Sequence, residues 1–272
     1  MILDKLSLEG KVAIVTGGGT GLGKAMCLAL AEAGANVVIG ARRLPLIEQT
    51  AEEVRAKGRK ALAVQTDVTV SRDCNNIVDR TYTEFGKVDI LVNNAGGGGA
   101  GAGKTLFDLT DEDWRLGIDT NITGTFYMSR AAAKVMVQQK RGKIINVASG
   151  FGLRGGRNNF MYTSAKAGVI NLTRSLALTL IQDNIQVNAI APGWLWNRGP
   201  VTSEEEKEQK RLRGRFTPLG RLGEAEEMGP LCVFLASDAS NYMTGELVTI
   251  DGGGLYGGIG LTGMAPVVPL HL

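Results

Sequence analysis

The chain has 272 residues, of which 44% are hydrophobic and 21% charged, and its formal net charge is +3. These values are typical of a globular protein with one sizeable core, and the dispersed charges give no reason to expect a nucleic-acid partner. The sequence has no run of about 18 apolar residues, so we expect no membrane span.

The cysteines and the histidine exclude several kinds of site. Cys27, Cys74 and Cys232 are far apart and lack the spacing of a metal or redox motif, so we expect reduced thiols in a cytoplasmic protein and no bound metal. The single histidine, His271, is next to last, which excludes histidine-based triads. Residues 1–6 include an acid and no long apolar core, so we expect no signal peptide.

A glycine-rich turn follows the first predicted strand. Residues 11–16 are a short apolar run, and residues 24–33 have a helical pattern. Glycines between a strand and a helix let the backbone approach a pyrophosphate at the amide end of the helix. We therefore predict dinucleotide contacts, with a plain surface loop as the alternative, from Gly17, Gly19, Thr20, Gly21, Leu22 and Gly23.

The residues after the second predicted strand, 36–40, indicate which dinucleotide is bound. An NAD site has a carboxylate near this point, which accepts a hydrogen bond from the ribose 2′-hydroxyl. Here the chain reads Ala41, Arg42 and Arg43, and two guanidinium groups suit a 2′-phosphate instead. We predict NADP rather than NAD; the alternative is that the arginines only begin the next helix in solvent.

The third predicted strand, 60–65, ends just before Asp67 and Val68. In an open parallel sheet, residues just past the strand ends line the ligand crevice, so Asp67 is a candidate contact of the adenine amino group. Alternatively, Asp67 caps the helix that begins after Thr69.

The fourth predicted strand, 88–92, leads into Asn94, Ala95 and Gly96. Small residues let the backbone lie close to a flat ring, so we predict cofactor contacts from all three. Residues 97–103 have almost no side chains, and their position past a strand end predicts a mobile wall or lid of the pocket.

Tyr162-x-x-x-Lys166 is a candidate proton-transfer pair. In a helix this spacing places the phenol and the ammonium on one face, one turn apart, where the cation would lower the tyrosine pKa. Ser149 follows the predicted strand 143–148 and could hold a carbonyl oxygen while Tyr162 gives it a proton. The pair alone is also compatible with a surface tyrosine beside a solvated lysine.

Two later helical segments bear on the site. Residues 111–139 form a long helical region in which Asn121 interrupts an apolar face, so this residue either is exposed or kinks the helix and holds a water. The charged helix 204–215, which follows the sixth predicted strand at 185–190, is either a solvated face or a substrate lid.

The alternation of strands and helices predicts an α/β fold: a single doubly wound Rossmann domain over 1–260 with a seven-stranded parallel sheet flanked by helices. The seventh strand is expected at 246–250. Residues 261–272 form an apolar, proline-containing tail, which we expect to pack on its own body or on a sister subunit.

The sequence resembles the short-chain dehydrogenase/reductase family over residues 8–256. The family motifs occur in order and in register: Thr16-Gly17-x-x-x-Gly21-x-Gly23, Asn93-Asn94-Ala95-Gly96, Asn121, Ser149, Tyr162-x-x-x-Lys166 and Pro192-Gly193.

The resemblance implies a catalytic tetrad. Tyr162 would be the acid/base, Lys166 would lower its pKa and bind the nicotinamide ribose, Ser149 would steady the substrate oxygen, and Asn121 would hold a relay water. Cofactor contacts are also implied for Pro192, Gly193, Leu195 and Asn197, although threonine is usual in the family at the last position. Family members are commonly tetramers or dimers built through helices that correspond to 111–139 and 161–181.

Three functions follow as expectations. The first is hydride transfer between NADP(H) and a ketone or secondary alcohol, such as a 3-oxoacyl thioester or a sugar. The glycine turn and the arginine pair also resemble those of the NADPH-dependent family branch that contains 2,4-dienoyl-CoA reductases. An NADPH-dependent enoyl-CoA reductase is therefore the alternative. A non-catalytic dinucleotide-binding regulator is the alternative of another class. The sequence is also strongly similar to 3-oxoacyl-acyl-carrier-protein reductases. One basic position that those enzymes use to dock the carrier protein is Asp183 here, whereas Lys140 and Arg141 keep the other basic patch.

Overall fold

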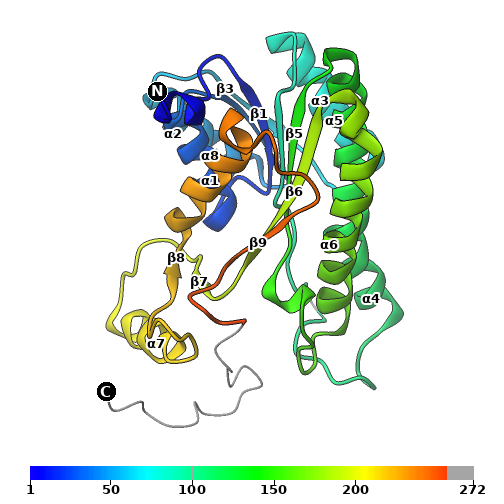
Figure 1. Cartoon of the computed structure of the whole chain (residues 1–272). Coiled ribbons are helices and arrows are strands. Elements are labelled where there is room, and N and C mark those ends of the chain that lie inside the picture. The colour runs from blue at the N-terminus through cyan, green and yellow to red at the C-terminus, as the bar shows by residue number, and fades with distance from the viewer. Residues whose placement is uncertain (100, 256–272) are drawn as a thin grey trace.

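One parallel sheet organises the chain, with the strand order β3-β2-β1-β4-β5-β6-β9 (Figure 1). The structure is a computed structural model that describes residues 1–99 and 101–255. The strands are β1 Val12–Thr16, β2 Asn36–Ala41, β3 Ala61–Gln65, β4 Ile90–Asn93, β5 Gly142–Val147, β6 Ile185–Pro192 and β9 Leu247–Ile250. The strand order reverses between β1 and β4, so the crevice at their carboxyl ends is the expected ligand site.

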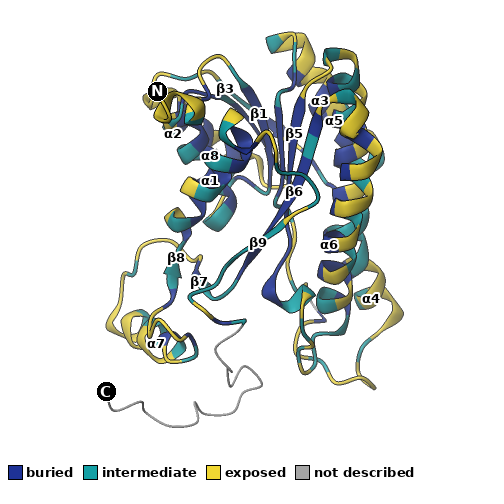
Figure 2. Cartoon of the chain, in the orientation of Figure 1, coloured by how far each residue is buried: buried dark blue, intermediate teal, exposed yellow. Residues whose placement is uncertain are grey.

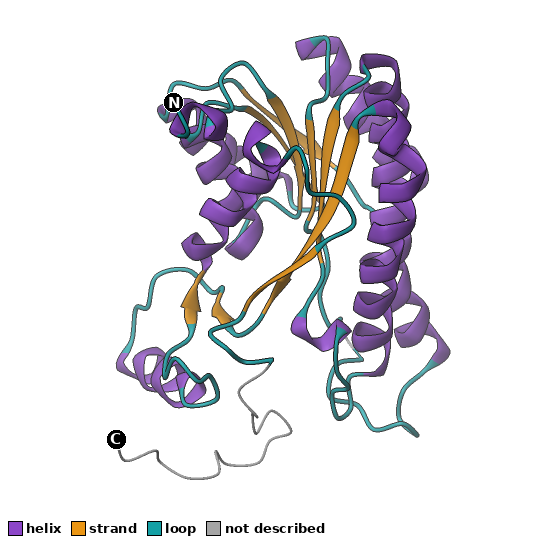
Figure 3. Ribbon diagram, in the orientation of Figure 1, coloured by secondary structure: helices purple, strands orange, loops and turns teal. Residues whose placement is uncertain are grey.

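Helices cover both faces of this sheet (Figures 1 and 3). One face carries α1 Gly21–Glu32, α2 Leu44–Ala56 and α8 Met228–Ala236, and the other carries α3 Ser71–Phe85, α5 Gly124–Gln139 and α6 Phe160–Leu180. Figure 2 shows the strands as the most buried part of the chain, as expected for parallel strands covered on both sides. The predicted doubly wound architecture is confirmed.

The long helical region predicted over 111–139 is divided in the structure. It consists of α4 Asp111–Ile118, a π-helical turn at Asp119–Thr123, and α5. A π turn inserts extra backbone into a helix and is common at functional sites. The long helical region predicted over 111–139 is therefore present, and at Asn121 the alternative of a distorted helix holds.

Shorter elements complete the fold. The helix predicted at 204–215 is α7 Glu204–Gly214, and a two-stranded sheet of β7 Leu195–Trp196 and β8 Gly223–Glu224 lies at its base. Short 3-10 turns occur at Leu3–Leu6, Gly150–Gly152, Ile181–Asp183, Ala225–Glu227 and Asp238–Ser240. Across the described ranges, no helix is both long enough and apolar enough to cross a bilayer. The predicted apolar tail, 261–272, lies outside the described residues.

Candidate active site

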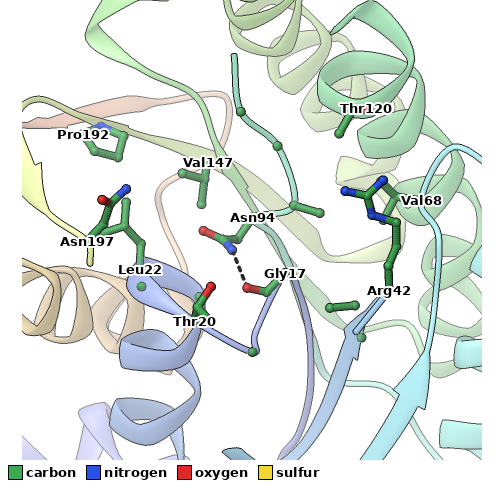
Figure 4. A pocket seen from close by; sticks show the side chains of 18 of the residues that line it. Gly17, Thr20, Leu22, Arg42, Val68, Asn94, Thr120, Val147, Pro192 and Asn197 are labelled. Carbon is green, nitrogen blue, oxygen red and sulfur yellow. Dashed lines mark hydrogen bonds between the residues drawn. The ribbon is translucent and has the colours of Figure 1, made fainter. Parts of the chain in front are cut away.

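Thr16 and Asn94 join the carboxyl ends of β1 and β4, where the strand order reverses. The Thr16 hydroxyl oxygen accepts hydrogen bonds from the backbone N–H groups of Asn94 and Ala95, both at 3.0 Å. The Asn94 side-chain amide donates to the carbonyl oxygens of Thr16 at 3.0 Å and Gly17 at 3.3 Å (Figure 4). These bonds fix the distance between the ends of β1 and β4 and orient the chain that leaves β4.

The glycine turn can form only because two of its residues lack a side chain. Gly17 has a φ of +67°, which side chains rarely tolerate. A β-carbon at Gly23 would lie 2.2 Å from the Gly17 carbonyl oxygen, so α1 begins directly against that backbone. Thr20, the residue before α1, makes no side-chain capping bond, which leaves the first amide groups of the helix available to an anion. The turn therefore fits a phosphate.

A cavity of about 450 Å³ runs along the carboxyl edge of the sheet, a volume within the usual range for a small-molecule site. It brings together every residue that the sequence predicts to contact the cofactor. They are Gly17, Gly19, Thr20, Gly21, Leu22, Gly23, Ala41, Arg42, Arg43, Asp67, Val68, Asn94, Ala95, Gly96, Tyr162, Lys166, Pro192, Gly193, Leu195 and Asn197. Ser149 lies in the same wall, whereas Asn121 does not line the cavity.

Gly97, the first residue of the segment predicted as a wall or lid, lines the cavity. Sequence reasoning missed six other lining residues: Gly40, Leu46, Thr66, Thr120, Val147 and Ala148. Gly40, Thr66 and Val147 lie at or just beyond the carboxyl ends of strands, so the strand-end rule used for Asp67 would have found them. Leu46 and Thr120 carry no such signal, because they come from the helical layers and reach the cavity only through the packing of those layers.

Arg42 and Arg43 are exposed at the end of β2 and contribute to one end of the cavity (Figure 4 labels Arg42). Asp67 also lines the cavity, and its Oδ1 accepts hydrogen bonds from the Thr69 backbone N–H and hydroxyl, at 3.0 and 2.8 Å. It does not cap α3, because that helix begins at Ser71 after Val70. The pocket end near β2 therefore presents two guanidinium groups and one locally engaged carboxylate.

Ser149 and Tyr162 meet at the opposite end of the cavity. The Ser149 hydroxyl oxygen accepts a hydrogen bond from the Phe151 backbone N–H at 3.1 Å, which orients the serine at the end of β5. Tyr162 lies in the first turn of α6, and its ring packs edge-on against the Phe151 ring with centroids 6.4 Å apart. Burial raises the pKa of Tyr162, and a hydrogen bond with Ser149 acts in the opposite direction.

Lys166 is buried one turn after Tyr162 and lines the same cavity. Its ammonium donates to the Val147 carbonyl oxygen at 2.7 Å and lies 5.6 Å from the Tyr162 ring centroid. Burial lowers the pKa of Lys166 to about 8. Desolvation of the phenol is the largest influence on the pKa of Tyr162, and the Lys166 ammonium is bonded to a backbone carbonyl. That this cation lowers the tyrosine pKa stays a prediction.

Asn121 is buried in the π turn and holds the chain that leaves β4. Its side-chain amide donates to the carbonyl oxygens of Gly97 and Gly117, both at 2.8 Å, and its Oδ1 accepts from the Gly97 N–H at 3.0 Å. The alternative of an exposed asparagine is therefore excluded. The structure assigns this side chain to the positioning of the loop rather than to the cavity wall.

The segment after β6 closes over the glycine turn. A β-carbon at Gly21 would lie 3.0 Å from the Asn197 carbonyl oxygen, so these two backbones nearly touch. The pairing of Leu195 with Gly223 and of Trp196 with Glu224 holds this segment against the base of α7. The cavity is thus bounded by the turn after β1 on one side and by the chain after β6 on the other.

Comparisons with known proteins agree with this geometry. The family model described as "Enoyl-(Acyl carrier protein) reductase" matches residues 17–254. The 2-dehydro-3-deoxy-D-gluconate 5-dehydrogenase of Escherichia coli (strain K12) is 41% identical over 260 residues, which cover 94% of this chain and 99% of the relative. The crystal structure of a short-chain type dehydrogenase/reductase from Mycobacterium marinum is 36% identical, with a TM-score of 0.84, over 94% of this chain and 99% of that one.

The chain belongs to the short-chain dehydrogenase/reductase family. The structure of a 7α-hydroxysteroid dehydrogenase complexed with NADH and 7-oxo glycochenodeoxycholic acid is also similar, at 35% identity and a TM-score of 0.84 over 93% of this chain and 97% of that one. This short-chain dehydrogenase/reductase is an oxidoreductase that uses a nicotinamide dinucleotide to interconvert carbonyl compounds and alcohols.

Proposed function

We propose that the protein is an NADP(H)-dependent ketone reductase or secondary-alcohol dehydrogenase, with Tyr162 as the acid/base. The observation that carries this proposal is the position of Ser149, Tyr162 and Lys166 in one wall of the cavity that also contains the glycine turn. A phenol, a hydroxyl and an ammonium group beside a phosphate-binding turn form the constellation that carbonyl reduction requires.

In the direction of reduction, the Tyr162 hydroxyl gives its proton to the substrate oxygen while Ser149 holds that oxygen in place. Ser149 is suited to this role because its oxygen already accepts from the Phe151 N–H, which fixes the hydroxyl beside Tyr162. Its single hydrogen can then turn from the phenol to the substrate oxygen. A bound nicotinamide supplies the hydride to the carbonyl carbon. Lys166 places a positive charge beside the phenol. Asn121 fixes the loop at Gly97, which with Gly96 would lie against a bound nicotinamide.

NADP rather than NAD is supported by the guanidinium groups at the end of β2. Both Arg42 and Arg43 line the cavity where the adenosine end of a dinucleotide bound at the glycine turn would lie. A ribose 2′-phosphate matches a guanidinium better than a hydroxyl does. The hydroxysteroid relative was solved with NADH, so the choice rests on this chain's own residues.

Arg42→Ser tests the cofactor preference. It should weaken NADPH binding by about 10- to 100-fold, as expected for the loss of a charge-assisted contact, and should leave NADH binding nearly unchanged. Arg55→Ser, which removes an exposed arginine of α2 that lies outside the cavity, is the matched control. An unchanged ratio of the two dissociation constants would contradict the NADP assignment.

Carbonyl chemistry is favoured over reduction of an enoyl thioester because both hydroxyl groups are present and meet at the cavity wall. A carrier-protein substrate is disfavoured because the two cations that would dock the carrier, Lys140 and Arg141, already pair with carboxylates of this chain. The Lys140 ammonium is 2.5 Å from an Asp183 carboxylate oxygen, and the Arg141 guanidinium is 2.5 Å from Asp238. Cations that already have carboxylate partners attract an acidic carrier less strongly.

Tyr162→Phe tests the reaction itself. It should lower turnover of every ketone and alcohol substrate by at least about 100-fold while NADPH binding, followed by fluorescence, is retained. Tyr82→Phe, at an exposed site on α3, is the control and should turn over normally. NADPH binding without turnover of any carbonyl compound by the unmodified protein would instead support a non-catalytic regulator.

The proposed assembly rests on exposed apolar side chains of two helices. Exposed apolar side chains on α5, on α6 and in the 3-10 turn after α6, including Phe126, Leu178 and Ile181, support a homodimer or homotetramer built through these helices. We also propose a single domain over 1–260 and a cytoplasmic location. Sedimentation of the full chain tests the assembly.

A further inference from the structure

Arg154 lies beside the proposed catalytic pair but has no role in the mechanism above. It follows the 3-10 turn at Gly150–Gly152, which connects β5 to α6. Its guanidinium carbon is 5.5 Å from the centroid of the Phe151 ring, and that ring packs edge-on against Tyr162. Arg154 is thus one aromatic ring away from the phenol that is proposed to transfer the proton.

The donors of this guanidinium are poorly satisfied. Among the residues that the structure describes, its hydrogen bond runs from Nη1 to the Gly254 carbonyl oxygen at 3.3 Å, which is long. Its Nε is buried and has no partner in the same residues. An arginine carries five N–H donors, and burying them without acceptors is costly. Burial also lowers the pKa of Arg154, with Asp251 acting in the opposite direction.

Arg154 is not among the residues that line the cavity, but its Nη2 is near the backbone that follows Ser149. A β-carbon built on Gly150 would be 3.9 Å from Arg154 Nη2 and 3.8 Å from the Pro192 carbonyl oxygen. Gly150 directly follows Ser149, and consecutive Cα atoms are about 3.8 Å apart. Nη2 therefore lies at most about 10 Å from the Ser149 Cα, a span that a small substrate covers.

We propose that Arg154 binds a carboxylate of the substrate, so that this enzyme acts on keto acids or hydroxy acids whose carboxylate lies a few carbons from the reacting carbon. The inference rests on the proposed function of Ser149 and Tyr162. A carboxylate matches the fork of guanidinium donors and would satisfy them, whereas a neutral polyol or ketone would leave them unpaired. Arg154 is then a specificity-determining residue and takes no part in proton transfer.

The test compares acids with neutral partners of nearly the same shape. The substrate pairs are 4-oxopentanoate with 4-oxopentanamide, 5-keto-D-gluconate with L-sorbose, and D-gluconate with D-gluconamide in the direction of oxidation. The full chain is assayed unmodified and as Arg154→Gln, Arg154→Lys and Arg157→Gln. Arg157 is exposed in the same loop and serves as the matched control.

The unmodified enzyme should prefer at least one acid over its neutral partner by about 10-fold or more in kcat/KM. Arg154→Gln should lose about 10- to 100-fold on that acid, mainly through KM, and little on the neutral partner. Arg154→Lys should keep part of the preference, and Arg157→Gln all of it. Calorimetric binding of D-gluconate to the NADPH-loaded protein should follow the same order, which gives a readout that does not require turnover.

Two results would overturn the proposal: no preference for any acid in the unmodified enzyme, or an equal loss on acids and neutral partners in Arg154→Gln. If Arg154→Gln does not fold, the preference of the unmodified enzyme and the result for Arg154→Lys decide. Neither result touches the proposed catalytic function, which is tested separately by Tyr162→Phe and by the turnover of the unmodified protein.

Discussion

Asn121 and Gly97 are joined by two reciprocal hydrogen bonds. The Gly97 N–H donates to Asn121 Oδ1 at 3.0 Å, and the Asn121 amide donates to the Gly97 carbonyl oxygen at 2.8 Å. Through this pair the π turn between α4 and α5 holds the loop that leaves β4. The loop backbone at Gly96 is consequently pressed close to both Asn121 and Lys166.

Asn121→Ala should destabilise the protein by about 1–3 kcal/mol, because it leaves the backbone groups of Gly97 and the buried carbonyl of Gly117 without their partner. Asn121→Asp should be no milder, since its carboxylate oxygen cannot donate to the carbonyl oxygens of Gly97 and Gly117 and adds a charge at a buried site. Urea unfolding measures the change, and Asn171→Ala, at an exposed site on α6, is the control. Equal stability of Asn121→Ala and the control would contradict this role.

Gly96→Ala should impair catalysis although it adds a single methyl group. The new carbon would lie 2.6 Å from Asn121 Oδ1 and 3.2 Å from Lys166 Nζ, so one of these groups must move. We expect turnover to fall by at least about tenfold and stability to fall by about 1–3 kcal/mol. Gly155→Ala, where a β-carbon meets nothing within 4 Å, should behave as the unmodified enzyme. Normal turnover in Gly96→Ala would show that this contact is easily relieved.

Ser149→Ala should shift the pH dependence of alcohol oxidation to higher pH. Oxidation needs the deprotonated phenol, and the hydrogen bond from Ser149 lowers the pKa of Tyr162. Its removal raises that pKa, so the rising limb of kcat/KM against pH moves to higher pH as overall activity falls. The residual activity of the variant is measured over pH 7 to 11, with Ser175→Ala as the control. A limb that stays in place would mean that Ser149 does not interact with the phenol.

Lys143→Met should stabilise the protein at neutral pH. Lys143 is 6% exposed at the start of β5, its Nζ donates only to the Ser240 hydroxyl at 3.2 Å in the described structure, and burial lowers its pKa to about 8. Below pH 8 the lysine is charged in both states and the full cost of burial applies. Replacing it should raise the free energy of unfolding by about 1–2 kcal/mol, allowing for partial solvation.

The pH dependence of that gain has a definite sign. Between the folded pKa of about 8 and the ordinary value of 10.5, the unfolded chain binds more protons than the folded one, so the unmodified protein becomes more stable as pH rises. The advantage of Lys143→Met should therefore shrink from pH 8 to pH 10. Lys60→Met, at an exposed site, should show no such trend. If the free energies of unfolding of Lys143→Met and of the unmodified protein differed by a constant amount from pH 8 to pH 10, Lys143 would not titrate in this range.

The elements and the chemical groups of the site can be predicted from the order of the residues alone. Each strand of β1 to β6 and β9 lies within a few residues of its predicted range, because buried parallel strands are apolar runs bounded by glycine and polar residues. The glycine turn, the arginine pair and Tyr162-x-x-x-Lys166 are recognisable because phosphate binding and proton transfer need particular residue types at short spacings. Strand ends then place these motifs at one edge of the sheet.

The pairing of those groups depends on contacts between segments that are far apart in the chain. The ammonium of Lys166 bonds to Val147, nineteen positions earlier, and Asn121 bonds to Gly97, so neither partner follows from local spacing. The rise in the pKa of Tyr162 likewise depends on burial by residues from several elements. Contacts between distant segments depend on how the helices pack on the sheet, and this packing sets the distances and the desolvation that a linear pattern of residues does not contain.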